Sequence, residues 1–294
     1  MMIMSKKAIY LVLISFICNL SFVSAKSDVF ETLKQNLIKD GFETEFIEKI
    51  FSQSYSEYIP NIITINVKQI ENGSNYVQYN KAAVAEKVKD YMSKNNEFLS
   101  KLYEKYNVPP GIICSILMIE SNFGKYLGKY RVINIYSSMA ASNTDRSINE
   151  IYEKYQKDAM LAEEHKYSRE NITQRVKKKS GWAYKELKIF LKYVKDNNID
   201  PFEIKGSFAG AFGLAQFIPS SFVHYAVDGN ADGKIDLYNH YDAMASIANY
   251  LKKNGWKKDL TEKEKNKVIR TYNHSKHYAN AVVNIAGRVI DSTQ

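Results

Sequence analysis

Apolar side chains recur every three or four positions along most of this 294-residue chain, a spacing that places them on one face of an α-helix. The pattern predicts helices over residues 30–51, 81–106, 110–123, 182–197, 242–255 and 261–290, with a break near Asn273 in the last. Helix-boundary residues agree, since Pro109-Pro110 opens one segment and Gly255 ends another. β-Branched residues at 62–67 could form a short strand, but nothing else indicates a sheet. We therefore expect a mainly α fold.

A strongly polar segment, residues 146–179, interrupts this pattern and ends in three consecutive lysines. Runs of charge are usually solvated, so we interpret it as a helical excursion exposed to water rather than as a binding patch. The composition, 45% hydrophobic and 25% charged with 13 Gly and 5 Pro, excludes a disordered or collagen-like chain. No repeat or linker divides the sequence, so one large domain or two closely packed lobes are both possible.

The first 25 residues show the three-part pattern of a secretory signal peptide. Lys6 and Lys7 form a basic start, residues 8–22 are mostly apolar, and Val23-Ser24-Ala25 supplies small residues for cleavage. The alternative is a permanent anchor, but the apolar run is short of the roughly 20 residues that a membrane span needs. We expect cleavage after Ala25, no stable membrane insertion, and one exported domain over residues 26–294, periplasmic or elsewhere in the cell envelope.

The charge of the chain points to an anionic partner. It carries 41 basic and 32 acidic side chains, a net charge of +9, which favours nucleic acid, a membrane surface or an acidic polymer. Export argues against nucleic acid and favours the polymers of a cell envelope. The chain has two cysteines, too few for a disulfide scaffold or a four-cysteine metal site.

One carboxylate breaks the apolar stripe of segment 110–123. Ile113, Ile116, Leu117, Glu120 and Phe123 are spaced to share one helix face. Burial disfavours the charged form of a carboxyl group, so the pKa of Glu120 should rise, which suits a general acid near neutral pH. The alternative is a structural Glu120 bonded to the backbone or to Arg131.

Two further stretches carry polar groups among small or aromatic residues. In 206–221, small residues recur so closely that a ligand or another backbone can approach, and Ser207 and Gln216 offer neutral hydrogen-bonding groups. A tightly packed helix pair is the alternative. In 270–279, His274 and His277 lack a third zinc ligand and the motif of zinc peptidases, so we interpret this stretch as a polar, aromatic wall that faces a sugar.

Residues 228–236 match the start of an EF-hand calcium loop. Asp228, Asn230 and Asp232 occupy its first, third and fifth positions, followed by Gly at the sixth. Asn239 stands at the twelfth position, where a glutamate is usual, and Asp242 could supply the missing carboxylate. The alternative is a surface turn that binds nothing tightly.

Taken together, these stretches resemble the B-type lytic murein transglycosylases, enzymes of lysozyme-like fold that cleave bacterial peptidoglycan. The resemblance runs from about residue 108 to 282, in family order. It rests on "VPPGIICSILMIESNFGKYLGKYRVINIYSSMA", "GSFAGAFGLAQFIPSSFVHYAVDGNADGKIDLYNHYDAMASIANYLKKNGW" and "TYNHSKHYANAV". It implies a helical domain of the goose-type lysozyme and soluble lytic transglycosylase kind, with an EF-hand-like loop.

The resemblance also implies a reaction and its catalytic group. Glu120 would be the single acid/base, cleaving the bond between N-acetylmuramic acid (MurNAc) and N-acetylglucosamine (GlcNAc) without water. The product would end in 1,6-anhydro-MurNAc, the partner would be peptidoglycan glycan strands, and no organic cofactor would be needed.

Other family positions carry over residue by residue. Ser207, Gln216 and Asn273 match positions that line the cleft, and Tyr250, Tyr272 and Tyr278 match its aromatic walls. Tyr79, with Tyr76 as a competitor, matches a further cleft tyrosine, and Arg146 falls near a family arginine. A structural calcium would be held by Asp228, Asn230, Asp232, the Lys234 carbonyl and Asp242.

Two other functions remain open at this point. A non-catalytic peptidoglycan-binding or scaffold protein could retain the same cleft, although a binder has no need of an acid with a raised pKa. A lysozyme-type hydrolase could use the same fold with water as the acceptor, and only the reducing or anhydro end of the product separates it from a transglycosylase.

Overall fold

The computed structural model describes residues 29–68, 73–162 and 168–291, and the expected signal peptide, residues 1–25, lies outside them. The mainly α fold is confirmed. The elements are α2 (Glu31–Lys39), α3 (Thr44–Phe51), α4 (Ile62–Lys68), η1 (Gly73–Asn80), α5 (Ala82–Lys94), α6 (Asn96–Tyr106), α7 (Pro110–Ser121), β1 (Tyr130–Arg131), α8 (Val132–Ala141), α9 (Asp145–Ala162), α10 (Arg169–Asp196), β2 (Lys205–Gly206), α11 (Pro219–Tyr225), α12 (His240–Lys253), α13 (Glu262–Tyr272) and α14 (Lys276–Asp291).

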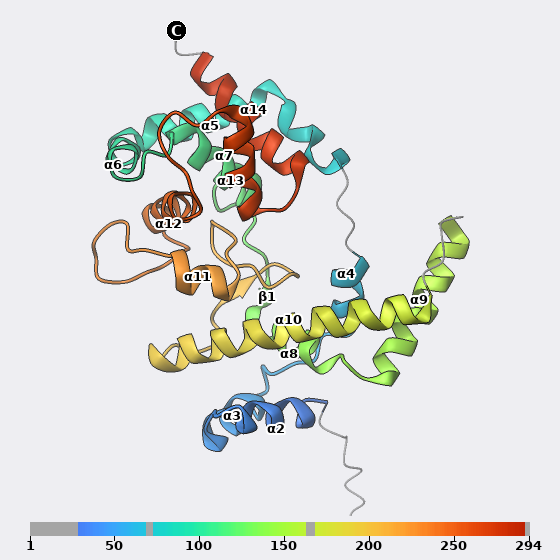
Figure 1. Ribbon diagram of the computed structural model, residues 1–294. Helices are drawn as coiled ribbons and strands as arrows, with labels where there is room; N and C mark the ends of the chain where they lie inside the picture. The colour runs from blue at the N-terminus through green and yellow to red at the C-terminus, as the bar shows by residue number, and fades with distance from the viewer. Residues whose placement is uncertain (1–28, 69–72, 163–167, 292–294) are drawn as a thin grey trace, which may run out of the picture.

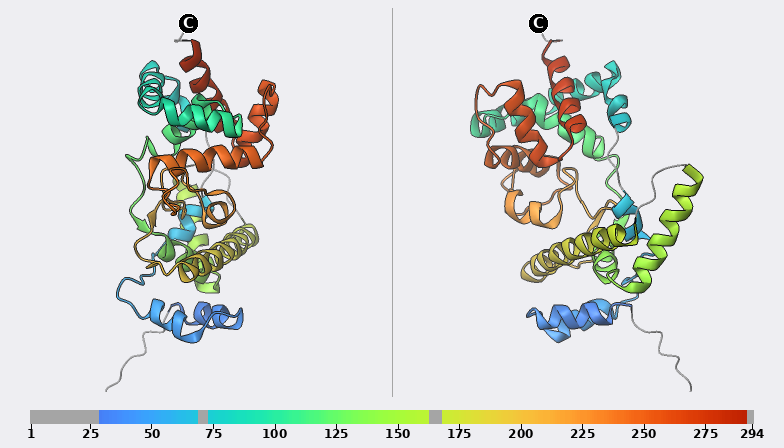
Figure 2. Two further views of the ribbon diagram at one scale, coloured as in Figure 1. Left: turned by 90° about the vertical axis from the view of Figure 1, so that its left-hand side faces the viewer. Right: turned by 45° about the vertical axis from the view of Figure 1, so that its right-hand side comes forward.

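The helices form two groups (Figures 1 and 2). In the upper group of Figure 1, α7 packs against α5, α6, α12 and α14, and α13 packs against α12 and α14. In the lower group, the long α10 packs against α4, α8 and α9, and the α2–α3 pair lies beyond α8. Helix α11 contacts both α10 and α12 and therefore joins the groups.

Two expectations about β-structure are wrong. Residues 62–67 form α4 and not a strand, because α4 packs its apolar side chains against α8 and α10. Within it, the Asn66 amide donates to the Ile62 carbonyl at 3.0 Å, one helical turn back. A small sheet is also present, since β1 and β2 pair antiparallel with Tyr130 opposite Gly206.

Three of the expected helices differ in extent. Segment 30–51 is divided by Gly41, whose φ of +99° ends α2, and segment 81–106 is divided at Asn95 into α5 and α6. Segment 182–197 is the second part of α10. These boundaries are set by positions that favour a left-handed or non-helical backbone. They are not set by a change in the spacing of apolar residues.

The charged segment 146–179 forms most of α9 and the start of α10 within the described residues. Its charged side chains are largely exposed, whereas Ile148, Ile151, Ile172 and Val176 are buried. Helix α9 extends away from the rest of the molecule (Figure 2, right). Among the described residues, no helix is both long and apolar enough to cross a membrane.

Close packing fixes the segment between β2 and α11. A Cβ on Gly210 would lie 2.4 Å from the Tyr136 ring, and one on Gly213 would lie 2.4 Å from the Leu237 side chain. Both glycines also have positive φ, 86° and 72°. Only glycine satisfies both conditions, so this stretch is a tightly packed loop and not the helix pair weighed above.

A buried carboxylate fixes the start of α11. Glu186 of α10 is 5% exposed, and it accepts hydrogen bonds from the Ser220 backbone N–H at 2.9 Å and from the Ser220 hydroxyl at 2.8 Å. It therefore satisfies one of the amides that the first turn of a helix leaves without an internal partner.

We expect Glu186→Ala to lower the free energy of unfolding by about 1–3 kcal/mol, because it leaves the partly buried Ser220 donors without their acceptor. Denaturant unfolding measures this. The control is Glu150→Ala, whose exposed ion pair with Arg146 should contribute about 0–1 kcal/mol. Equal losses for the two variants would contradict the role of Glu186.

Candidate active site

Helix α7 ends one residue after Glu120. Asn122, Phe123 and Gly124 follow with positive φ angles of 50°, 56° and 91°. The amides of Asn122 and Phe123 donate back to the carbonyls of Met118 and Leu117, at 3.0 and 3.3 Å, and close the helix. The Phe123 ring then stacks on Tyr91 of α5, with centroids 4.1 Å apart. This turn fixes the backbone of the last helical turn, where Glu120 stands.

The carboxyl group of Glu120 is perturbed by its surroundings. Burial raises its pKa from the ordinary 4.5 to about 7, against the opposing effect of a hydrogen bond from Tyr278. The Tyr278 hydroxyl donates to Glu120 Oε1 at 2.7 Å. Arg131 is not its partner, since that guanidinium lies 4.7 Å from the centroid of the Tyr55 ring. Near neutral pH, Glu120 can both donate and accept a proton.

The structure brings Tyr250, Tyr272 and Tyr278 together beside Glu120. Tyr272 lies parallel to Tyr278 at 6.4 Å and meets Tyr250 edge-on at 4.8 Å. Burial, with the nearby Glu120 charge as a second cause, raises the pKa of the Tyr272 and Tyr278 phenols. Both therefore remain neutral hydrogen-bond donors at the pH where Glu120 titrates.

Glu120 lines a pocket of about 560 Å³ between α5 and the end of α7. Tyr79 lines the same pocket and donates from its hydroxyl to the Ile119 carbonyl at 3.2 Å. Tyr76, the competing candidate, instead packs edge-on against Tyr278 with centroids 6.1 Å apart. Of the two tyrosines, Tyr79 is the one that lines the Glu120 pocket.

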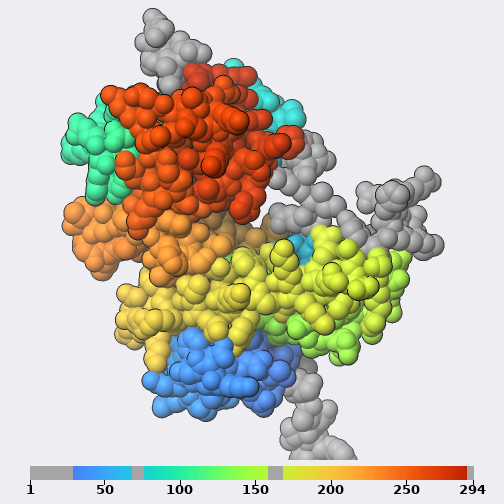
Figure 3. Space-filling view, viewed as in Figure 1, coloured from blue at the N-terminus to red at the C-terminus, as the bar shows by residue number. Residues whose placement is uncertain are grey.

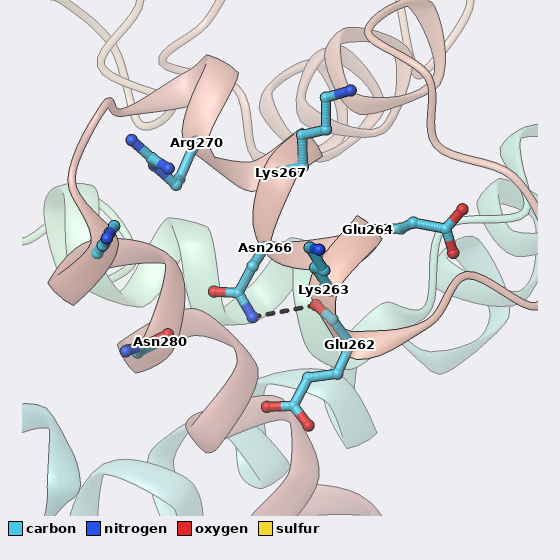
Figure 4. Close-up of a pocket in the computed structure, with 8 residues that line it drawn as sticks. Glu262, Lys263, Glu264, Asn266, Lys267, Arg270 and Asn280 are labelled. Atoms are coloured by element: carbon cyan, nitrogen blue, oxygen red, sulfur yellow. Dashed lines mark hydrogen bonds between the residues drawn. The ribbon is translucent and has the colours of Figure 1, made fainter.

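A larger pocket, of about 970 Å³, lies elsewhere, between α13 and α14 (Figure 4). It is lined by Glu262, Lys263, Glu264, Asn266, Lys267, Arg270, Lys276 and Asn280. Glu264 accepts hydrogen bonds from Thr261 that lower its pKa, the opposite of the shift at Glu120. The smaller pocket is the candidate active site, because a perturbed carboxyl in a concave site indicates chemistry better than volume does.

Ser207 and Gln216 stabilise the glycine-containing loop. The Ser207 hydroxyl accepts from the Ala211 amide at 3.2 Å, and the Gln216 amide donates to the Gly213 carbonyl at 2.8 Å. The Tyr272 hydroxyl donates to the Ala215 carbonyl in the same loop. This bond links the loop to the tyrosine cluster.

Asn273 and Arg146 differ in their placement. Asn273 follows α13 directly after Tyr272, and its side-chain oxygen accepts from the Ser275 amide at 3.2 Å, which places it at the edge of the tyrosine cluster. Arg146 lies on α9 in the other helix group, 88% exposed, and pairs with Glu150 at 2.9 Å. The structure does not bring Arg146 to the other candidate residues.

The candidate calcium loop is held together by its own amides. Asp228 accepts from the amides of Asp232 and Gly233, and Asp242 accepts from those of Gly229 and Asp236. Within the described ranges, no three His, Cys, Asp or Glu side chains are grouped so that they could hold a metal. The oxygen donors have the chemistry that calcium prefers, and each carboxylate oxygen keeps a further lone pair.

Sequence reasoning missed several residues of the Glu120 pocket. Gln78, Lys81, Lys87 and Tyr126 line it, but none belongs to an apolar stripe or to a stretch rich in small residues. Tyr126 is 63% exposed, a property that only the structure reveals.

Comparisons of the sequence and of the structure with known proteins point to the same family. Residues 25–266 match the family described as transglycosylase SLT domain. Membrane-bound lytic murein transglycosylase B of Escherichia coli is 31% identical over 231 residues, which cover 75% of this chain. The chain spans about half the length of that relative, 55% of which is aligned.

Solved structures show the same fold. The soluble lytic transglycosylase SltB1 of Pseudomonas aeruginosa superposes with a TM-score of 0.69 at 23% identity, over 89% of this chain and 98% of its own. Escherichia coli Slt35 in complex with calcium gives 0.67 at 22% identity, over 91% and 94%. Pseudomonas aeruginosa SltB3 in complex with NAG-NAM-pentapeptide gives 0.66 at 19% identity, over 89% and 79%.

The lysozyme-like helical fold is thus confirmed, and the family match extends over most of the sequence, from the expected cleavage site to the middle of α13. The chain belongs to the B-type lytic transglycosylases of the lysozyme-like superfamily.

Proposed function

We propose that this protein is an exported peptidoglycan lytic transglycosylase that cleaves the MurNAc–GlcNAc β-1,4 bond and leaves 1,6-anhydro-MurNAc ends. The observation that carries the proposal is the Glu120 carboxyl group, which has a pKa of about 7 and lines a pocket beside three tyrosines. A carboxyl group with this pKa is present in both protonation states near neutral pH, as a group that acts in turn as acid and base requires.

The reaction uses Glu120 twice. Protonated Glu120 donates its proton to the glycosidic oxygen as the C1–O bond of MurNAc breaks, and GlcNAc leaves with a free hydroxyl. The resulting carboxylate then takes the proton of the MurNAc 6-hydroxyl, whose oxygen forms a bond to C1. No water is consumed, and Glu120 ends in its starting state.

No second carboxylate is required in this scheme. Ordinary glycosidases pair two carboxylates across the bond, whereas here the substrate's own acetamido group supports the charge that develops at C1. Within the part of the chain that the structure describes, Glu120 is the only carboxylate among the residues lining its pocket.

Other candidate residues hold the sugar. Tyr272, which is partly exposed, would form the aromatic wall, with Tyr250 and Tyr278 buried behind it, and Tyr278 also orients Glu120. Ser207, Gln216 and Asn273 offer neutral groups for sugar hydroxyl and acetamido groups. Arg146 has no part in the proposal in this arrangement, because its guanidinium lies exposed on α9.

Calcium binding to the loop 228–242 is a second part of the proposal. Asp228, Asn230, Asp232 and Asp242 would supply side-chain oxygens, and Lys234 its carbonyl. Slt35, of the same fold, is known as a calcium complex. The ion would replace part of the amide bonding of the loop and stabilise it, a structural role.

The proposed location is the cell envelope. The signal-peptide pattern of residues 1–25 and the net charge of +9 support export toward an anionic envelope polymer. The curated relative is named as membrane-bound, so the location within the envelope is a separate question for fractionation.

The products decide between the candidate functions. Mass spectrometry of muropeptides released from purified sacculi by the wild-type protein should show 1,6-anhydromuramic ends, lighter by one water than hydrolysis products. Reducing ends would indicate a lysozyme-type hydrolase, and no release would favour the non-catalytic binding protein.

We expect Glu120→Gln to lower turnover by about 10²–10⁴-fold, the usual contribution of a positioned acid/base, while binding to sacculi is retained. The Tyr278 hydroxyl can still donate to the Gln oxygen, so the fold should persist, as circular dichroism would check. Glu262→Gln, in the α13–α14 pocket, is the matched control. Turnover close to wild type in Glu120→Gln would refute the assignment.

Tyr278→Phe should shift the pH profile toward alkaline pH. The Tyr278 hydrogen bond stabilises the charged carboxylate and lowers the pKa of Glu120, so its loss raises that pKa. Since the first step needs protonated Glu120, activity should fall at a higher pH in Tyr278→Phe than in the wild type. A profile of kcat/KM against pH that does not move, or that moves to lower pH, would contradict this role.

Calcium should raise the melting temperature, because an ion that binds only the folded state stabilises it. Asp232→Asn should abolish the increase, whereas Asp259→Asn, an exposed position outside the loop, should keep it. Identical melting curves with calcium and with a chelator would remove calcium from the proposal.

A further inference from the structure

We infer that Lys81 and Lys87 form, at the rim of the Glu120 pocket, a recognition site for the carboxylates of the peptide that the glycan substrate carries. The inference rests on the proposed function, because it assigns a second part of the same substrate to the same pocket. It concerns selection of peptide-bearing over bare glycan and not the bond-breaking step.

Both lysines line the pocket that contains Glu120. Lys87 shares a face of α5 with Ala83 and Val84, four and three residues before it, and all three line the pocket. Lys81 is the residue before α5 begins and lines the pocket as well. The pocket lining therefore carries two positive charges, one just before α5 and one within it.

Neither lysine is engaged by the protein. Both are exposed, and among the described residues neither forms an ion pair, although other lysines do, such as Lys94 with Asp90 on the same helix. Apart from Glu120 itself, no carboxylate among the residues that the structure describes lines the pocket. A pair of free ammonium groups in a pocket otherwise without acidic partners favours an anionic ligand.

The lysines do not serve to tune Glu120. The pKa of Glu120 is set by burial and by the Tyr278 hydroxyl, and a close ammonium group would have lowered that pKa. Both lysines line the pocket without being among the groups that set this pKa, so their charges are available to a ligand.

The chemistry of the ligand follows from the substrate. SltB3, of the same fold, binds a NAG-NAM disaccharide that carries a pentapeptide, and any peptide ends in a carboxylate. The lysine ammonium is a compact charge on a flexible stem, which suits an anionic group on a mobile peptide. Tyr126, 63% exposed in the same pocket, offers a flat surface against which a peptide can lie.

General attraction between a basic protein and an anionic polymer is the competing explanation. The α13–α14 pocket provides the control, since Lys263 and Lys267 line it (Figure 4) and Glu120 is not among its lining residues. Lys263→Gln with Lys267→Gln removes the same two charges from a different pocket of the same helix group. If only the substitutions in the Glu120 pocket change substrate preference, the cause is recognition of the peptide and not the overall charge of the protein.

The experiment compares two substrates: glycan strands with their peptides, and the same strands after an amidase has removed the peptides. For the double variant Lys81→Gln, Lys87→Gln, the ratio of kcat/KM on peptide-bearing to peptide-free strands should fall about tenfold, the loss expected for two exposed ion pairs. The loss should lie in KM, and it should shrink at high salt. The Lys263→Gln, Lys267→Gln variant should keep the wild-type ratio.

Several outcomes would overturn the inference: an unchanged ratio, equal losses on the two substrates, or the same fall in the control variant. Binding of the peptide-bearing strands to Glu120→Gln, with and without the two lysine substitutions, repeats the test without turnover. If the wild type cleaves neither substrate, the proposed function fails, whereas cleavage of both with an unchanged ratio refutes only the lysine site.

Discussion

The hydrogen bond from Tyr278 to Glu120 is the contact on which the site depends. It joins α7 to α14, two helices whose residues are 158 positions apart in sequence. Tyr278 is itself fixed by the stack with Tyr272, and Tyr272 is tied to the loop at Ala215. The position of one carboxyl group therefore requires the central helix, the C-terminal helix pair and the glycine-containing loop to assemble together.

The two helix groups contribute differently to this assembly. The upper group supplies Glu120 and the tyrosines, whereas the lower group supports the loop through Tyr136, whose hydroxyl donates to the Gly210 carbonyl at 3.2 Å. Glu186 of α10 fixes the start of α11 at the end of that loop. The α2–α3 pair stands at the far end of the molecule from α13 and α14 (Figure 3) and takes no part in the site.

Much of this could be predicted from the sequence. Glu120 was recognisable because a carboxylate on an apolar stripe is rare, and the tyrosines followed from the family resemblance. The strand at 62–67 was wrong because burial against α8 and α10 overrode β propensity. Lys81, Lys87 and Tyr126 could not be found from the sequence. They matter because their part of α5 and the turn after α7 border the pocket, and no local sequence pattern shows which segments do so. Arg146 is the opposite case, because it matches a family position in the sequence but lies in the other helix group.

The raised pKa of Glu120 also has a consequence for stability. A carboxyl group whose pKa is raised by folding leaves the free energy of unfolding unchanged at pH values below its ordinary pKa of 4.5. At higher pH it lowers the free energy of unfolding, and this loss is complete above about pH 7. A shift of this size corresponds to about 3 kcal/mol, a substantial part of the 5–15 kcal/mol that typically stabilises a domain. Conditions that ionise Glu120 therefore weaken the fold, and under the proposed function they also remove the acid that the reaction needs.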